Sequence, residues 1–149
     1  MHLKTEIDIN APIEIVWRNF FAFDTYPEWS PFIKRFVGTP KVGEKVTVTL
    51  QPPGGNGMDI SPNVINVDAP REFRWKGKLF VKGIFDGEHV FRFEQTGDAT
   101  THFIHEEFFG GIFKGLIMAK IWDSTEQGFR EYNEALKARA EAEYKEAAS

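Results

Sequence analysis

The chain has 149 residues, of which 42% are hydrophobic and 27% charged, a size and composition that fit one domain with its own core and exclude a disordered chain. It contains no cysteine, which excludes disulfides, thiolate catalysis and thiolate metal ligands. The net charge of -4 argues against nucleic acid as a partner, because binding to phosphates needs clustered Lys and Arg side chains.

The N-terminal part of the chain predicts one strand followed by two short helical segments. Apolar and polar residues alternate over Leu3–Asn10, as in a strand with one buried face. Ala11-Pro12 then precedes apolar residues at helical spacing, which predict an amphipathic helix ending near Ala22. Asp24–Trp29 is typical of a second short helix or turn, which Ser30-Pro31 ends.

The middle of the chain predicts about six strands in a meander. They cover Phe32–Gly38, Lys45–Gln51, Met58–Val67, Arg71–Leu79, Phe85–Gln95 and Thr100–Phe109, with a connection over Phe80–Gly83. Pro62 interrupts the third of these strands, which indicates a sheet edge or a bulge. Since the connections are of hairpin length, we expect an antiparallel sheet.

From Ile112 to about Tyr144 the pattern is that of one long helix with a continuous apolar stripe. A sheet of this size must bury one face, and this helix is the only predicted element large enough to cover it. A curved sheet wrapped around one helix rarely fills the enclosed space. We therefore expect a single α+β domain over residues 1–149, with about six or seven strands around the long C-terminal helix and a cavity inside.

Three stretches of the sequence resemble one known superfamily. They are Ile9-Asn10-Ala11-Pro12 with Val16-Trp17, Phe23–Ile33, and His105-x-Glu107-x-Phe109-x-Gly111 with Asn133–Lys137. These stretches are similar to the "A-P-x-x-x-V-W", "Y-x-x-W-x-P-F" and "N-x-x-L-K" segments of the SRPBCC superfamily, which includes START lipid-transfer domains and proteins of the birch-pollen-allergen type. Ser30 stands where Asn is more usual. The nearest subgroup is the polyketide cyclase/dehydrase-like set, and the resemblance implies the helix-grip fold.

Three polar residues are the candidates for chemistry. His105 and Glu107 share one face of the last strand, and His89 shares a face with Phe91 and Phe93 on the strand before it. If Phe103 and Phe109 face the helix, a hairpin at Gly97-Asp98 makes these strands neighbours and the three side chains can converge. The register leaves the opposite face of the last strand, with His102, Ile104, Glu106 and Phe108, as the alternative. An imidazole and a carboxylate in an apolar pocket can act as general acid and base, or can orient a polar group of a ligand. Alternatively they only satisfy each other, a helix residue or water, and nothing reacts.

The aromatic content of 15% allows two interpretations, a bulky core or the walls of a ligand pocket. In the second interpretation the walls are Phe73, Trp75, Phe91, Phe93, Phe103, Ile117, Ile121 and Phe129, and Tyr132 offers its hydroxyl to the ligand. No compact spacing of His and carboxylates predicts a metal site, and no cofactor is implied.

The sequence favours binding of a small hydrophobic or amphipathic molecule, such as a lipid or a polyketide-like aromatic compound. One alternative is a cofactor-independent cyclase, dehydratase or isomerase with His105 or Glu107 as the base. Another is a co-chaperone-like interaction domain with a filled interior and an exposed apolar patch. No apolar run reaches the ~20 residues that span a bilayer, and no signal peptide is recognisable, so we expect a cytoplasmic monomer or weak homodimer.

Overall fold

The computed structural model describes residues 1–79 and 83–149 of the chain. Its elements, in chain order, are β1 (His2–Ile9), α1 (Ile13–Phe21), the 3-10 turn η1 (Phe23–Thr25), α2 (Tyr26–Trp29), β2 (Phe32–Val37), β3 (Thr47–Gln51), β4 (Met58–Ile60), β5 (Asn63–Asp68), β6 (Glu72–Leu79), β7 (Phe85–Gly97), β8 (Thr100–Gly110) and α3 (Lys114–Ala147). The connection predicted over Phe80–Gly83 lies, apart from Gly83, outside the described residues.

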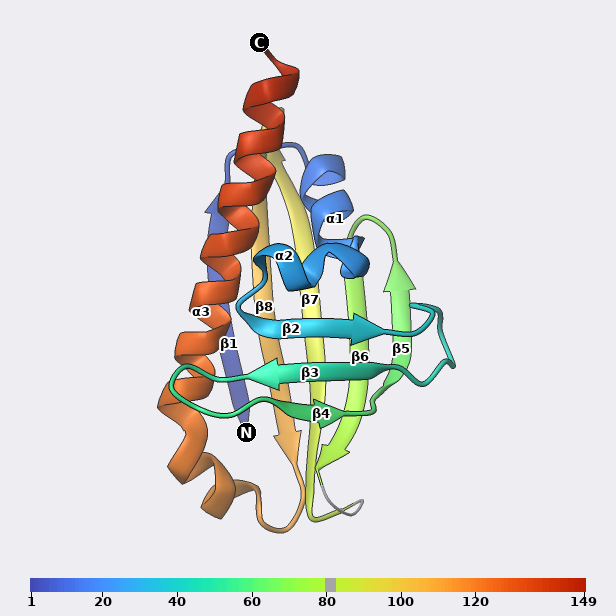
Figure 1. Cartoon of the computed structure of the whole chain (residues 1–149), viewed down its shortest axis with the longest axis vertical. Coiled ribbons are helices and arrows are strands. Elements are labelled where there is room, and N and C mark those ends of the chain that lie inside the picture. The colour runs from blue at the N-terminus through green and yellow to red at the C-terminus, as the bar shows by residue number, and fades with distance from the viewer. Residues whose placement is uncertain (80–82) are drawn as a thin grey trace.

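The strands form two antiparallel sheets that face each other. The larger sheet has the order β1-β8-β7-β6-β5, and the smaller one has the order β2-β3-β4. The three strands of the smaller sheet cross those of the larger sheet, and α3 runs along the side of both (Figure 1). The backbone of Val46 donates to the carbonyl of Pro62, so the two sheets are linked at the β5 edge. The result is one strongly curved wall beside a long helix.

This arrangement confirms the helix-grip fold, with eight strands where the sequence indicated six or seven. The difference comes from Met58–Val67, which the alternation pattern treated as one strand. Pro62 divides it into β4 and β5, which belong to different sheets. Since proline has no backbone N–H to donate, the chain leaves one sheet at this residue and enters the other.

The interior differs from the expected hollow, because most of it is filled with aromatic rings. Helix α1 and the turn η1 cover the half of the large sheet that α3 does not reach (Figure 1). Phe20 of α1 packs against Phe91 and Phe93 of β7 with ring centroids 4.8 and 5.0 Å away, and Phe23 stacks on Phe36 at 3.9 Å. The terminal helix is therefore not the only cover of the sheet, and among the described residues the pocket between the two sheets lies toward the opposite end.

Helix α3 approaches the small sheet closely at Gly128. A Cβ atom at this position would overlap the ring of Phe32, the first residue of β2, whose φ of 59° is unusual for a non-glycine residue. The close approach places the N-terminal half of α3 beside the mouth of the remaining space. Within the described residues, no helix combines the length and the apolar character needed to cross a membrane.

Candidate functional site

The remaining space is a partly open apolar pocket at the end of the molecule where α3 begins. Phe32, Leu50, Pro52, Met58 and Ile60 line it from the small sheet, Trp75, Gly77, Lys78, Phe85, Gly87, Glu107 and Phe109 from the large sheet, and Ile121 and Thr125 from α3. The centre of a water molecule can occupy about 80 Å3, and the whole empty volume, including the open mouth, is about 650 Å3. The predominantly apolar lining of the pocket, rather than its modest enclosed volume, suits a small apolar molecule.

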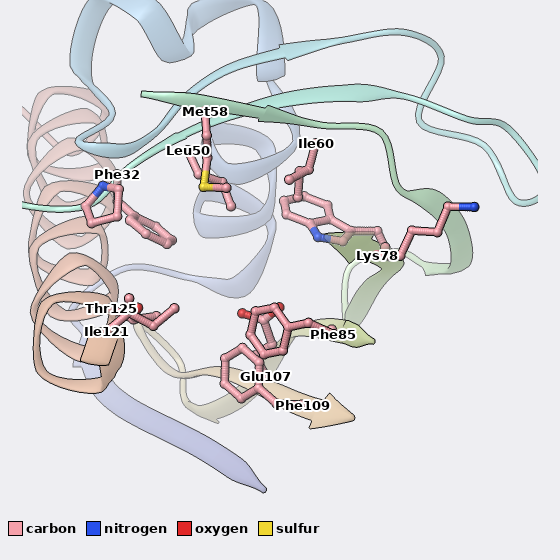
Figure 2. A pocket seen from close by; sticks show the side chains of 14 residues that line it. Phe32, Leu50, Met58, Ile60, Lys78, Phe85, Glu107, Phe109, Ile121 and Thr125 are labelled. Atoms are coloured by element: carbon pink, nitrogen blue, oxygen red, sulfur yellow. The ribbon is translucent and has the colours of Figure 1, made fainter. Parts of the chain in front are cut away.

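Glu107 is the one acidic side chain in the pocket wall formed by the described residues. Figure 2 shows it on the same side of the pocket as Phe85 and Phe109, across from Leu50 and Met58, whereas Lys78 extends away from the centre. Burial among these apolar groups raises the pKa of Glu107 to about 8. Its side chain nevertheless retains 17% exposure through the pocket. Near neutral pH the pocket therefore presents an uncharged carboxylic acid.

Gly87 makes room for this carboxyl group. It lies opposite Phe109 on β8, two positions before His89 along the same face of β7. A Cβ atom at residue 87 would overlap Oε2 of Glu107. The absence of a side chain at this position thus allows the carboxyl group to sit against the backbone of β7 and face the pocket.

His89 and His105 lie behind Glu107 and are fully buried. The β7–β8 register pairs His89 with Glu107 and Phe91 with His105, which brings the three polar side chains together. His89 Nδ1 is 3.6 Å from Oε1 of Glu107, and the Nε2 atoms of the two histidines are 2.6 Å apart. Burial lowers the pKa of His105 to about 3, and burial together with the nearby His105 lowers the pKa of His89 well below its usual value. Both rings are therefore neutral.

The polar chain continues from His105 into helix α3 and strand β1. His105 Nδ1 is 2.8 Å from Oδ1 of Asn133, whose Nδ2 donates to Oγ1 of Thr5 at 2.8 Å. Thr5 in turn donates to the backbone carbonyl of His105 at 2.9 Å. All four side chains from His89 to Thr5 are buried and tie β7, β8, α3 and β1 together.

Of the residues predicted to form the site, Trp75, Glu107 and Ile121 line the pocket. The other predicted wall residues lie in the packed core next to it. At most 2% of the surface is exposed in Phe73, Phe91, Phe93, Phe103, Phe129 and Tyr132, and Ile117 packs against the same core. They do not face empty space because α1, η1 and α2 fill that half of the interior. The Tyr132 hydroxyl is bound to the Tyr26 hydroxyl at 2.6 Å and offers nothing to a ligand. His89 and His105 stand behind Glu107 and do not line the pocket.

The prediction omitted several pocket residues, and part of the omission was avoidable. Side chains on one face of a strand recur at every second residue. Gly87 and Phe85 lie two and four positions before His89 on β7, and Phe109 lies two positions after Glu107 on β8, so all three share the predicted face. Leu50, Met58 and Ile60 carry no such signal, because their position opposite the large sheet depends on how the small sheet folds over it. Thr5 also carries no local signal, since it is a single polar residue on an otherwise apolar face, whereas Asn133 opens the "N-x-x-L-K" segment but was given no role in the site.

The sequence matches the model of a family described as "Polyketide cyclase / dehydrase and lipid transport" over residues 1–141. The chain belongs to this family. Membership agrees with the resemblance to the SRPBCC superfamily and with the helix-grip architecture. The family description covers both ligand binding and cyclisation, and it does not specify which of the two this member performs. None of the curated proteins searched matches the chain.

Solved structures with the same fold include two enzymes. The Zhui aromatase/cyclase from Streptomyces sp. R1128 has a TM-score of 0.76 at 14% identity, over 95% of this chain and 93% of that one. Norcoclaurine synthase from Thalictrum flavum has a TM-score of 0.73 at 14% identity, over 100% and 96%. A protein from Arthrobacter aurescens has a TM-score of 0.73 at 17% identity, over 93% and 85%. At these identities the likeness establishes the fold of this polyketide cyclase/dehydrase family member, and its function must be argued from its own pocket.

Proposed function

We propose that the protein binds a small, largely apolar molecule in the pocket between the two sheets. The observation that carries the proposal is the single uncharged carboxyl group, Glu107, set in a wall that is otherwise almost entirely apolar and aromatic. Ligand sites combine these features, since apolar contacts supply affinity and a few polar groups fix orientation. The rest of the interior is filled with aromatic rings, so this pocket is the place where a ligand would bind.

Filling the pocket tests this proposal. We expect Leu50→Trp to place an indole in the empty volume and to abolish binding of small aromatic molecules, measured by titration calorimetry. Val37→Trp is the control, because Val37 is 46% exposed on β2 and does not line the pocket. Native mass spectrometry of both variants, purified from the host, should show a co-purified apolar compound only with Val37→Trp. Equal binding by the two variants would contradict the proposal.

A second candidate function is an isomerase or cyclase that uses Glu107 as general base and acid. The observation favouring it is a carboxyl group whose pKa of about 8 lies close to neutral pH, where a group can both accept and return a proton. The carboxylate would take a proton from a carbon next to a carbonyl group, and the resulting acid would return it to another carbon or oxygen of the same molecule. His105 does not fit this role, because both its ring nitrogens are engaged in the buried chain.

This enzymatic candidate predicts proton exchange at the carbon next to the carbonyl of a bound bicyclic ketone such as 2-tetralone. Exchange in D2O, followed by NMR, should accelerate in wild-type protein as the pH rises through about 8, since the carboxylate form is the base. Glu107→Gln should reduce the rate to that of the ketone with no protein. An unchanged rate in Glu107→Gln would exclude Glu107 as the base.

A further inference from the structure

The buried hydrogen bonds that link Thr5, Asn133, His105 and His89 allow one arrangement of protons. It can be assigned beginning from a backbone carbonyl group. The carbonyl oxygen of His105 can only accept, so the hydroxyl of Thr5 must donate its single proton to it. Thr5 Oγ1 then has only its lone pairs left, and Asn133 must present its NH2 group to them. The Asn133 carbonyl oxygen therefore faces His105 Nδ1, and this nitrogen must carry a hydrogen.

The same reasoning passes through the two histidines to the pocket. Neutral His105 with its hydrogen on Nδ1 has a lone pair on Nε2, so His89 must donate from its own Nε2 across the 2.6 Å contact. Neutral His89 then has a lone pair on Nδ1. That atom is buried and has no hydrogen-bond partner among the described residues. It faces Oε1 of Glu107 at 3.6 Å, from which a small rotation of the carboxyl group closes a hydrogen bond.

The unpaired lone pair on His89 determines how protonated Glu107 orients its hydrogen. An acceptor left unpaired in a buried site costs about 1–3 kcal/mol, so the O–H group of Glu107 turns toward His89. The second oxygen of the carboxyl group then faces the pocket as a carbonyl acceptor beside Gly87. No side chain of the described residues donates a hydrogen bond to this oxygen.

From this fixed proton order we infer that the molecule bound in the pocket is uncharged and donates a hydrogen bond to Glu107, as a phenol or an alcohol does. The inference rests on the proposed function and adds the chemical class of the ligand. Ethers and ketones of the same shape have only hydrogen-bond acceptors, which cannot form a hydrogen bond with the carbonyl oxygen of Glu107. Carboxylates, including free fatty acids, would in addition place a negative charge among apolar side chains.

Three ring compounds of nearly equal shape test the inference near pH 6, where Glu107 is protonated. They are 2-naphthol, which donates a hydrogen bond, 2-methoxynaphthalene, which does not, and 2-naphthoate, which is an anion. We expect 2-naphthol to bind wild-type protein about tenfold more tightly than the ether by titration calorimetry, the value of one buried hydrogen bond. We expect no measurable binding of 2-naphthoate.

Two variants of Glu107 separate its hydrogen-bond direction from its charge. In Glu107→Gln the amide NH2 group can donate to His89 and the amide oxygen can face the pocket, so the preference for 2-naphthol should remain. In Glu107→Leu the acceptor is gone and the two neutral compounds should bind equally. A loss of the preference in Glu107→Gln would overturn the inferred proton order.

The outcomes also separate this inference from the proposed function. Equal affinity of wild-type protein for 2-naphthol and 2-methoxynaphthalene, with both blocked by Leu50→Trp, would leave the binding function standing and overturn the ligand class. Tighter binding of the ether or of 2-naphthoate would do the same. Failure of all three compounds to bind wild-type protein would overturn both.

Discussion

Replacing Glu107 with glutamine is expected to stabilise the protein against unfolding by about 3 kcal/mol near pH 8. In the unfolded chain this carboxyl group ionises near its usual pKa of 4.5, whereas in the folded protein it keeps its proton until about pH 8. Between these values folding must retain a proton that the unfolded chain releases, so stability falls as the pH rises. The full difference corresponds to at most ~5 kcal/mol, and the 17% exposure of the side chain reduces it.

Urea unfolding of the wild type and the variant at several pH values measures this effect. The difference in free energy of unfolding should be small near pH 4 and grow steadily toward pH 8. His89 is the titratable group that faces Glu107 from β7, and Lys78 lies at the pocket rim; both are present in the two proteins, so their contributions largely cancel. Glu94→Gln, at an exposed position on β7, is the control and should change stability by less than ~0.5 kcal/mol. A pH-independent difference would show that Glu107 is not held in its protonated form.

Asn133→Leu is expected to destabilise the protein by about 3 kcal/mol although leucine has a similar volume and is apolar. The substitution leaves the Nδ1–H of His105 without its acceptor and the lone pairs of Thr5 Oγ1 without their donor in a buried site, although the Thr5 hydroxyl still donates to the carbonyl of His105. Each unpaired buried group costs about 1–3 kcal/mol. Chemical denaturation gives the value, and because Asn133 does not line the pocket, the folded fraction should still bind small aromatic molecules, while the preference for 2-naphthol should weaken because Asn133 fixes the proton order.

A double-mutant cycle with Thr5→Val is the control for this prediction. Thr5→Val removes the other end of the same hydrogen bond, so the double variant should cost less than the sum of the two single variants by about 1 kcal/mol or more. Strict additivity would mean that the two side chains are energetically independent. In that case the hydrogen-bonded side chains from Thr5 to His89 would not act as one unit, and the inferred arrangement of their protons would no longer be supported.

Much of the fold could be predicted from local pattern. The period-two alternation of Leu3–Asn10 and the helical stripe after Ile112 correspond to β1 and α3, and the Gly97-Asp98 turn joins β7 and β8. That turn makes β7 and β8 neighbours, and a bulge between Gln95 and Gly97 sets the register that brings His89, His105 and Glu107 together. The prediction of one strand over Met58–Val67 was wrong, because Pro62 divides it between two sheets and no local pattern reveals the second sheet.

The sequence by itself thus determined the order of the elements, whereas the inward face of β8, and with it the meeting of one carboxyl group with two imidazoles, was an expectation that depended on the strand register. Only the tertiary structure decided which of these side chains face empty space. That depends on α1 and η1 filling one half of the interior with Phe20 and Phe23, and on the small sheet folding over the other half with Leu50 and Ile60. Such contacts join segments far apart in the chain, and their geometry is set by how whole layers pack, which the periodicity of any single element does not record.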